Sequence, residues 1–325
     1  MAWAPICASV WGCRKKWRAS SRALTACTVV WRPRPVRVLI VGTGLIGGSI
    51  ARGLQARESA VTLWGIDADP AAQAEAAASG VFDAVGWPPE FTQDDLLVLA
   101  VPTAVAAALL PTLTPALAAR ATITDVASVK APLAQALETL APAHQRQVVL
   151  GHPIAGSERS GLAASQGGLF EGRRVVLTPK ENTDPAALAR VERLWQTLGA
   201  TVETMSVAAH DAVLARTSHL PHLLAFALVD ALGADPHREA IYRLVAGGFR
   251  DFTRIAGSDP TMWSQIFTSN GPALLEALHR FEDTLGTFRR AIAAGDAEAL
   301  FQAIARARAV RGAALEESFG AKHDL

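Results

Sequence analysis

The chain has 325 residues, half of them hydrophobic, and a formal net charge of +1 at pH 7. This length is enough for two domains that each bury a core. A charge so close to zero excludes a general attraction to nucleic acid, so we expect a globular protein with no nucleic-acid partner.

Residues 1–35 differ in composition from the rest of the chain. They contain all three cysteines, four of the eight tryptophans and many Lys and Arg residues, but no Asp or Glu. An Arg- and Ser-rich stretch without acids is typical of a transit peptide. No apolar segment is long enough for a secretory signal, and we favour a disordered or non-native extension. Because the rest of the chain has no cysteine, we expect a reducing, cytoplasmic location.

A glycine-rich turn between two apolar stretches predicts a dinucleotide site. Residues 38–41 are expected to form a strand that ends in the turn at residues 42–47, and an amphipathic helix follows to about Arg57. A second apolar strand, residues 61–66, ends in Asp67. Strand, glycine turn, helix, strand and acid together are the signature of a Rossmann dinucleotide-binding unit.

Each glycine of this turn has a physical task. Gly42 makes the tight turn, Gly44 lets the backbone approach a pyrophosphate, and Gly47 lets helix and strand pack closely. The helix begins at Leu45 and Ile46, and free N–H groups at a helix N-terminus favour an anion. Asp67 would accept the ribose hydroxyls of NAD and repel the 2′-phosphate of NADP.

Further strands are expected at residues 96–101, 121–125, 148–151 and 174–178. Residues 96–119 carry no charge and could span a membrane by length, but prolines interrupt them, so we interpret them as a buried strand and a helix and expect no membrane contact. Doubly wound sheets bind ligands beyond the carboxyl ends of their strands. The positions at such ends, which are expected to line one site, are Gly42, Asp67, Val101, Pro102, Ser128 and His152.

From about residue 184 the pattern becomes helical. A long segment, residues 207–232, is expected to begin at a Ser206 cap and to kink or break at Pro221. Later helices are expected near residues 237–246, 261–268, 271–293 and 296–317. The fold class is therefore an α/β Rossmann domain (36–182) followed by an all-α domain (183–325) that binds substrate and, through wide apolar faces, forms a homodimer.

His152 and Ser128 are candidates for chemistry. A histidine at a strand end, followed by a proline, can titrate near neutral pH and serve as the base for an alcohol proton while hydride leaves the same carbon. The alternative is a structural histidine bonded to a loop carbonyl. Ser128 could bond the same alcohol or the imidazole, or it could cap the helix around Lys130.

His219, His222 and the two arginines of the segment at residues 249–254, Arg250 and Arg254, are candidates for binding an anion. The two histidines lie three residues apart, but no further ligand at sensible spacing supports a metal site. They could bind an anionic substrate or lie in the core. Arginine suits forked recognition of a carboxylate, although an arginine in this segment could simply pair with Asp251.

Several motifs, in order, resemble the prephenate/arogenate dehydrogenase family of tyrosine biosynthesis. They are VGTGLIGGSIA, DVASVK, GHPIAGSERSG, LFEGRRVVLTP, SHLPHLLAFALVD and GGFRDFTRIAGSDPTMW, and they extend through nearly all of residues 36–270. The resemblance implies a Rossmann domain, a helical dimerisation domain, and oxidative decarboxylation of prephenate to 4-hydroxyphenylpyruvate with reduction of NAD.

The resemblance also implies residue roles. His152 matches the base, Ser128 its partner at the ring hydroxyl, and Arg254 the binder of the side-chain carboxylate. The remaining matches line, support or border the pocket: His210, His219, His222, Trp263, Ser157 and Glu158. Because a strong cation on the ring carboxylate would oppose its loss as CO2, we expect that group to meet neutral donors.

Two other classes of protein are built on the same two-domain plan. β-Hydroxyacid dehydrogenases resemble one another in a catalytic lysine on the helical domain, and residues 181–321 contain no lysine. A non-catalytic NAD-binding protein would not need His152, Ser128 and Arg254 together. Prephenate and arogenate differ only at the side chain, which carries a keto group in prephenate and an ammonium group in arogenate. The residues do not distinguish between the two substrates.

Overall fold

The computed structural model describes residues 36–319, apart from residues 59, 115–120 and 157–158. The expectations for residues 1–35 and for Ser157 and Glu158 therefore lie outside the described residues.

Eight strands form one sheet in the order β3-β2-β1-β4-β5-β6-β7-β8. The neighbours from β3 to β6 pair in parallel, which is the strand order of a doubly wound dinucleotide-binding sheet. β7 is antiparallel to β6, and β8 is parallel to β7. The strands are β1 (Val36–Val41), β2 (Val61–Ile66), β3 (Ala84–Val85), β4 (Leu96–Leu99), β5 (Thr122–Asp125), β6 (Val148–Pro153), β7 (Arg174–Thr178) and β8 (Thr201–Thr204).

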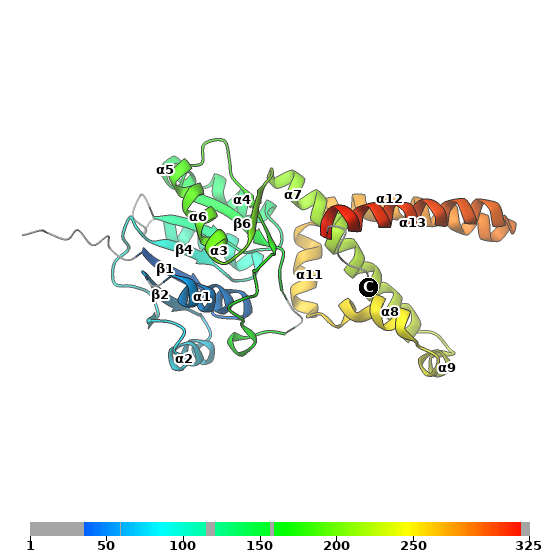
Figure 1. Ribbon diagram of the computed structural model, residues 1–325, viewed down its shortest axis with the longest axis horizontal. Helices are drawn as coiled ribbons and strands as arrows, with labels where there is room; N and C mark the ends of the chain where they lie inside the picture. The colour runs from blue at the N-terminus through cyan, green and yellow to red at the C-terminus, as the bar shows by residue number, and fades with distance from the viewer. Residues whose placement is uncertain (1–35, 59, 115–120, 157–158, 320–325) are drawn as a thin grey trace, which may run out of the picture. The chain divides into compact units, whose positions relative to one another are not determined.

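Both faces of the sheet are buried under helices, and the central strand β4 is accordingly apolar throughout. Alternate residues of β1 show the two layers: Val38 and Ile40 pack into one core cluster, and Leu39 and Val41 into the other. The first cluster contains residues of α1 and α6, and the second contains residues of α3 and α4 (Figure 1). The helices of this part are α1 (Leu45–Arg57), α2 (Pro70–Ala78), α3 (Thr103–Leu113), α4 (Ala131–Glu138), α5 (Pro142–Gln145), η2 (Leu162–Ala164) and α6 (Pro185–Thr197).

The sheet domain continues past the boundary predicted at residue 182. β8 pairs with β7, and α6 packs on the sheet through Trp195, which is 0% exposed and lies 5.2 Å from the Phe170 ring, centroid to centroid. The predicted boundary is wrong because helical periodicity in α6 also suits a helix that covers a sheet. The domain extends to Thr204, so the helical part begins near Ser206.

The second part is helical, as predicted. The Ser206 side chain accepts a hydrogen bond from the Ala209 N–H and caps α7, which confirms the predicted helix start. The short helix α10 was not predicted. The helices are α7 (Val207–Leu214), η3 (Ala215–His219), α8 (Leu220–Gly233), α9 (Arg238–Arg243), α10 (Gly247–Thr253), η4 (Arg254–Gly257), α11 (Pro260–Ser269), α12 (Gly271–Ala294) and α13 (Ala297–Phe319).

Pro221 disturbs the helix without ending it. Proline has no N–H to donate to the carbonyl of Thr217, and the turn before α8 is a π-helix, η3, in which the Leu220 N–H donates to the Ala215 carbonyl. Such turns are frequent at functional sites. Within the described residues, the stretch from Val207 to Gly233 is long and apolar enough to cross a membrane, a test that buried helices of soluble proteins also pass.

The three glycines of the turn differ in their surroundings. Gly42 has φ +97°, and a Cβ there would lie 2.2 Å from the carbonyl oxygen of Ala100. At Gly47 a Cβ would lie 1.9 Å from the carbonyl oxygen of Gly42, so only glycine lets α1 approach β1 this closely. A Cβ at Gly44 would meet nothing within 4 Å, so this glycine leaves space for a ligand rather than for the protein.

Trp195→Ala is expected to destabilise the sheet domain by about 3–5 kcal/mol, since it empties a fully buried aromatic site. Denaturant unfolding of the full chain measures this free energy. Trp87, which is 46% exposed, provides the matched control: Trp87→Ala should change stability far less. Equal effects of the two substitutions would contradict the assignment of α6 to the core of the sheet.

Gly44→Ala and Gly47→Ala are expected to separate binding from folding. The Gly47 variant should lower the melting temperature, because its methyl group must displace backbone. The Gly44 variant should melt like the wild type but bind a dinucleotide more weakly, because its methyl group stands where a phosphate would approach. Calorimetry with NAD, together with thermal unfolding, checks both; unchanged affinity in the Gly44 variant would remove this turn from the cofactor site.

Candidate active site

The carboxyl ends of the parallel strands bring the predicted positions to one edge of the sheet. Gly42 follows β1, Asp67 follows β2, Pro102 lies beyond β4, Ser128 lies beyond β5, and His152 is near the end of β6. Because these strands are parallel neighbours, their ends lie side by side.

The glycine turn and Asp67 form one unit. Asp67 Oδ2 accepts hydrogen bonds from the Thr43 N–H (2.9 Å) and the Thr43 hydroxyl (3.0 Å). Its Oδ1 accepts from the Asp69 N–H at 3.0 Å. The carboxylate is therefore held beside the turn, half-buried, where its remaining lone pairs can accept ribose hydroxyls.

The residues at this edge fit a dinucleotide. The N-terminus of α1 has no side-chain cap and no acidic residue in its first turn, so its N–H groups remain available for a pyrophosphate. Leu45 and Ile46 are half-buried at this helix start. On the adjacent strand end, Val101 is half-buried and Pro102 is exposed. Backbone donors, an open glycine and a fixed carboxylate are the groups that NAD requires.

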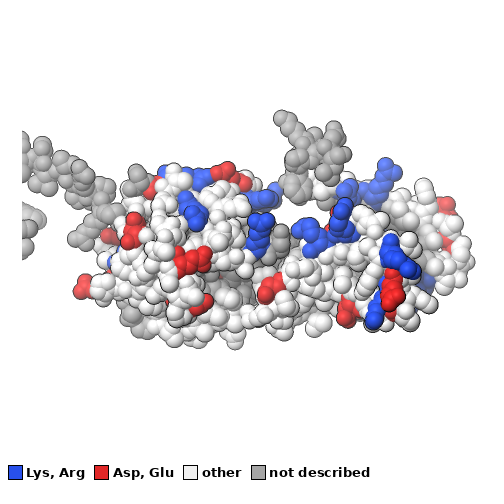
Figure 2. Space-filling view, turned by 90° about the horizontal axis from the view of Figure 1, so that it is seen from below, with Lys and Arg blue, Asp and Glu red and all other residues white. Residues whose placement is uncertain are grey.

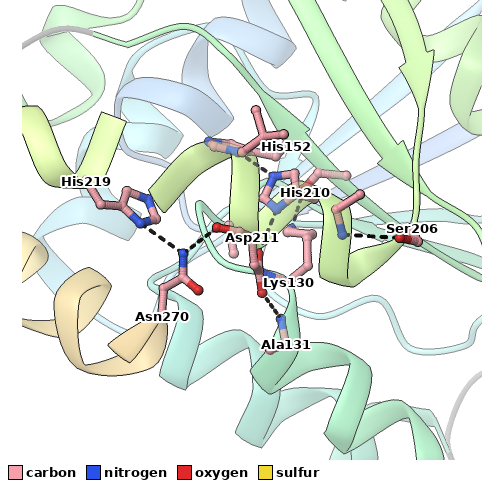
Figure 3. Close-up of polar contacts among 12 residues, drawn as sticks. Lys130, Ala131, His152, Ser206, His210, Asp211, His219 and Asn270 are labelled. Atoms are coloured by element: carbon pink, nitrogen blue, oxygen red, sulfur yellow. Dashed lines mark hydrogen bonds and ion pairs between the residues drawn. The ribbon is translucent and has the colours of Figure 1, made fainter. Parts of the chain in front are cut away.

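His152 is part of a buried chain of hydrogen bonds that joins the two parts of the protein (Figure 3). Its Nδ1 lies 2.9 Å from His210 Nε2, and His210 Nδ1 lies 2.7 Å from Asp211 Oδ1. His152 belongs to β6, whereas His210 and Asp211 belong to α7. The alternative interpretation was a structural histidine bonded to a loop carbonyl. The Nδ1 of His152 contacts His210 instead.

Asp211 also caps α4. Its Oδ1 accepts from the Lys130 N–H (2.9 Å), and its Oδ2 accepts from the Ala131 N–H (2.8 Å). The alternative that Ser128 caps this helix is therefore wrong, because a carboxylate from the helical part takes that place. Ser128 is half-buried, and its hydroxyl makes no hydrogen bond to another described residue, so it is available to a ligand.

A buried ion pair lies below His152. Lys130, which is 0% exposed, pairs with Asp125 and donates to the carbonyl of Gly151, the residue before His152. Asp125 Oδ1 in turn accepts from the Gly151 N–H at 3.1 Å. Burial lowers the pKa of Lys130, and the charge of Asp125 and the hydrogen bond to it oppose that shift. The pair fixes the end of β6 that carries His152.

Burial lowers the pKa of His152 well below 6.5, and electrostatic interactions with Lys130, His210 and His219 lower it further. The expectation that His152 titrates near neutral pH is therefore corrected, because a charged imidazole here would lose its solvation. Burial alone would raise the pKa of Asp211, but hydrogen bonds from His210 and from the Lys130 and Ala131 N–H groups outweigh burial, so this pKa is lowered. At neutral pH the site holds a neutral His152 and an ionised Asp211.

His219 is neutral, and its Nε2–H can donate a hydrogen bond. Asn270 Nδ2 donates to the Asp211 carbonyl (2.8 Å) and to His219 Nδ1 (3.0 Å). Because an amide nitrogen can only donate, His219 Nδ1 accepts and its proton lies on Nε2. Burial lowers the pKa of His219 to about 4; Asp211 opposes this shift, and His210 and His222 add to it.

His222, Trp263 and Arg254 form a second group. The His222 ring stacks on Trp263 with centroids 3.7 Å apart, and its Nδ1 donates to the Ser218 carbonyl at 2.8 Å. Burial lowers the pKa of His222; the Ser218 bond opposes the shift and the nearby Arg254 guanidinium adds to it. Arg254 is exposed. The Trp263 Nε1 is buried and has no hydrogen-bond partner in the structure.

The structure thus brings together His152 with His210, and His219 and His222 with Trp263. Sequence reasoning missed three residues of the site: Lys130, Asp211 and Asn270. Two were within reach, since Lys130 ends the quoted motif DVASVK and Asp211 directly follows His210. Asn270 carried no signal. No group of three or more His, Cys, Asp or Glu residues in the described part could hold a metal ion.

Comparisons with known proteins agree with this architecture. Residues 50–204 match the family model of the prephenate dehydrogenase nucleotide-binding domain, and residues 206–306 match that of the prephenate dehydrogenase dimerization domain. The junction between the two models coincides with the end of β8.

Curated relatives and solved structures extend the match. Cyclohexadienyl dehydrogenase of Zymomonas mobilis is 36% identical over 82% of this chain and 91% of the relative. Prephenate dehydrogenase of Bacillus subtilis is 34% identical over 82% of this chain and 72% of the relative. The structure of Aquifex aeolicus prephenate dehydrogenase with hydroxyphenyl propionate and NAD+ has a TM-score of 0.77 at 36% identity, covering 87% of this chain and 98% of that one. Synechocystis arogenate dehydrogenase has a TM-score of 0.72 at 28% identity, covering 85% and 99%.

Two family models that together cover most of the chain, and relatives above 30% identity over four-fifths of it, all point to one family. The chain therefore belongs to the prephenate dehydrogenase family, and its cofactor is NAD.

Proposed function

We propose that this protein catalyses the oxidative decarboxylation of prephenate to 4-hydroxyphenylpyruvate and CO2. The observation that carries the proposal is a neutral, buried His152 at the sheet edge that also holds the cofactor turn. A base at this position can take a proton from an alcohol whose carbon loses hydride toward the nicotinamide. NAD, when bound, supplies the hydride acceptor.

His152 and Ser128 are assigned to the ring hydroxyl. His152 removes the hydroxyl proton, and the half-buried Ser128 hydroxyl, at the end of the neighbouring strand, orients the same oxygen. Gly42, Gly44, Leu45, Ile46, Gly47, Asp67, Val101 and Pro102 are assigned to the cofactor. These assignments follow from the positions at strand ends and from the chemistry of each side chain.

The helical part supplies groups for the two carboxylates of prephenate. Arg254, beside His222, is assigned to the side-chain carboxylate, since a guanidinium binds it strongly. His219 is neutral with its proton on Nε2 and is assigned to the ring carboxylate. A neutral donor orients that group without stabilising its charge, so the carboxylate can leave as CO2 while the ring becomes aromatic. Ser157 and Glu158 are proposed to lie near the pocket by family resemblance.

We infer that the protein acts as a cytoplasmic homodimer through its helical part. Large apolar side chains of α12 and α13 are exposed in the single chain, among them Leu275 (66%), Ile292 (66%), Phe301 (63%) and Val310 (70%). On the face in Figure 2, uncharged residues cover most of the surface. Apolar side chains exposed to this extent favour burial against a second copy.

Purified protein with NAD is expected to oxidise prephenate with a higher kcat/KM than arogenate. Both substrates carry the side-chain carboxylate, but the ammonium of arogenate would lie close to the Arg254 guanidinium, and like charges repel. NADH formation with each substrate in turn measures the preference. A preference for arogenate would make the protein an arogenate dehydrogenase, and no NADH with either substrate would contradict the proposed reaction.

His152→Asn is expected to lower kcat by roughly 10²–10⁴-fold, the range for loss of a positioned base, with NAD affinity unchanged. The wild-type kcat/KM should rise with pH through a group whose pKa lies well below 6.5, since the base must be neutral and burial lowers its pKa. At neutral pH the rate is then already on its plateau. His152 would be ruled out as the base if the variant had near-normal turnover. It would also be ruled out if the pH profile of the variant kept the rise at acidic pH.

A further inference from the structure

Three side chains form a hydrogen-bonded triad: Asp211, His210 and His152 (Figure 3). A carboxylate can only accept, so the 2.7 Å contact requires a proton on His210 Nδ1. If His210 is the neutral imidazole, its Nε2 carries the lone pair and accepts across the 2.9 Å contact to His152 Nδ1. His152 Nδ1 is therefore the donor, and its lone pair lies on Nε2.

We propose that Asp211 and His210 are positioning residues that fix His152 in the tautomer whose Nε2 is free to act as the base. This inference rests on the proposed function of His152. A carboxylate behind a catalytic histidine holds its tautomer and orientation in the same manner in serine hydrolases. Here a second imidazole lies between the carboxylate and the base.

The far end of the triad is anchored on both sides. The Asp211 carboxylate accepts from the backbone of Lys130 and Ala131, and the Asp211 carbonyl accepts from Asn270 Nδ2. The near end is anchored by the Lys130–Asp125 pair, which holds Gly151 from both its N–H and its carbonyl. Rotation of the His210 ring would therefore break two buried hydrogen bonds, and rotation of the His152 ring would break the bond between the two histidines.

Three of the charged and titratable groups around His152 oppose its protonation. The two nearby carboxylates are engaged by other residues. Lys130 lies on the loop before α4, His210 on α7 and His219 on η3, and each lowers the His152 pKa. Asp125, on β5, is paired with Lys130, and Asp211 is turned toward His210. The base is thus neutral, and the acceptor at Nδ1 decides which nitrogen holds its single proton.

Histidine ¹⁵N NMR at neutral pH tests the proposal directly, because the two tautomers have different ring-nitrogen shifts. Wild-type His152 and His210 should each show a protonated Nδ1 and an unprotonated Nε2. The signals are assigned by their loss in His152→Asn and His210→Gln. A proton on His152 Nε2 in the wild type would overturn the proposal, and this reading stands even if a variant fails to fold.

Two substitutions at His210 provide the kinetic test and leave the Asp211 cap of α4 in place. His210→Leu removes the acceptor and should lower kcat about 10- to 100-fold, the cost typical of lost supporting partners, with the KM for NAD unchanged. His210→Gln keeps an amide oxygen that can accept from His152 Nδ1 and should restore most of kcat. Wild-type kcat in the leucine variant, or equal losses in both variants, would overturn the positioning role.

His279 offers a matched control, since it is an exposed helical histidine whose Nε2 lies 3.8 Å from Asp283. His279→Leu should leave kcat unchanged. The NMR reading needs no turnover, which separates the two hypotheses. If the protein shows the predicted tautomers but oxidises neither prephenate nor arogenate, the triad is supported and the proposed function is contradicted. If the protein oxidises a substrate but His152 carries its proton on Nε2, the proposed function is supported and the triad is contradicted.

Discussion

The carboxylate of Asp211 is the interaction on which the site depends. It accepts three hydrogen bonds: two from the backbone at the start of α4 and one from the ring of His210. A carboxylate at a helix N-terminus is typically worth about 0.5–2 kcal/mol, but its larger effect is geometric. One side chain of the helical part fixes the loop after β5 and, through His210, the base on β6. This contact joins the two parts of the protein at the site, together with the packing of Val129 against Trp263 and Ile266.

Burial then decides the charge states. A charge in the interior persists only with a partner, and Lys130 has one in Asp125 while Asp211 has several donors. Among the described residues no carboxylate is in direct contact with His152 or His219, and burial lowers the pKa of each. Burial keeps the His152 ring unprotonated at neutral pH and so able to accept a proton. The positive charge of Lys130 lowers the pKa of His152 further.

Much of the fold was predictable because short patterns encode it. The glycine turn, the apolar strands and Asp67 required only local spacing, and a doubly wound sheet was expected from them. The domain boundary was not predictable in this way, since α6 and β8 are assigned by what they pack against. Lys130 and Asp211 belong to different parts of the chain, and their roles arise from a contact across 81 positions of sequence. Ser128 shows the converse: local spacing suggested a cap, and a distant carboxylate took that place.

Two buried histidines of the site are fixed in opposite tautomers by their neighbours. His152 carries its proton on Nδ1 because His210 accepts there, and His219 carries its proton on Nε2 because Asn270 donates to its Nδ1. In the proposed reaction these assignments match opposite tasks: one ring must accept a proton, and the other must donate a hydrogen bond without carrying charge. A cation in place of His219 would bind the ring carboxylate more tightly in the ground state than in the transition state, where its charge is leaving, and would slow the reaction. In the proposed reaction the permanent charge lies on the exposed Arg254 and the neutral imidazoles are buried, which would resolve this conflict between binding and decarboxylation.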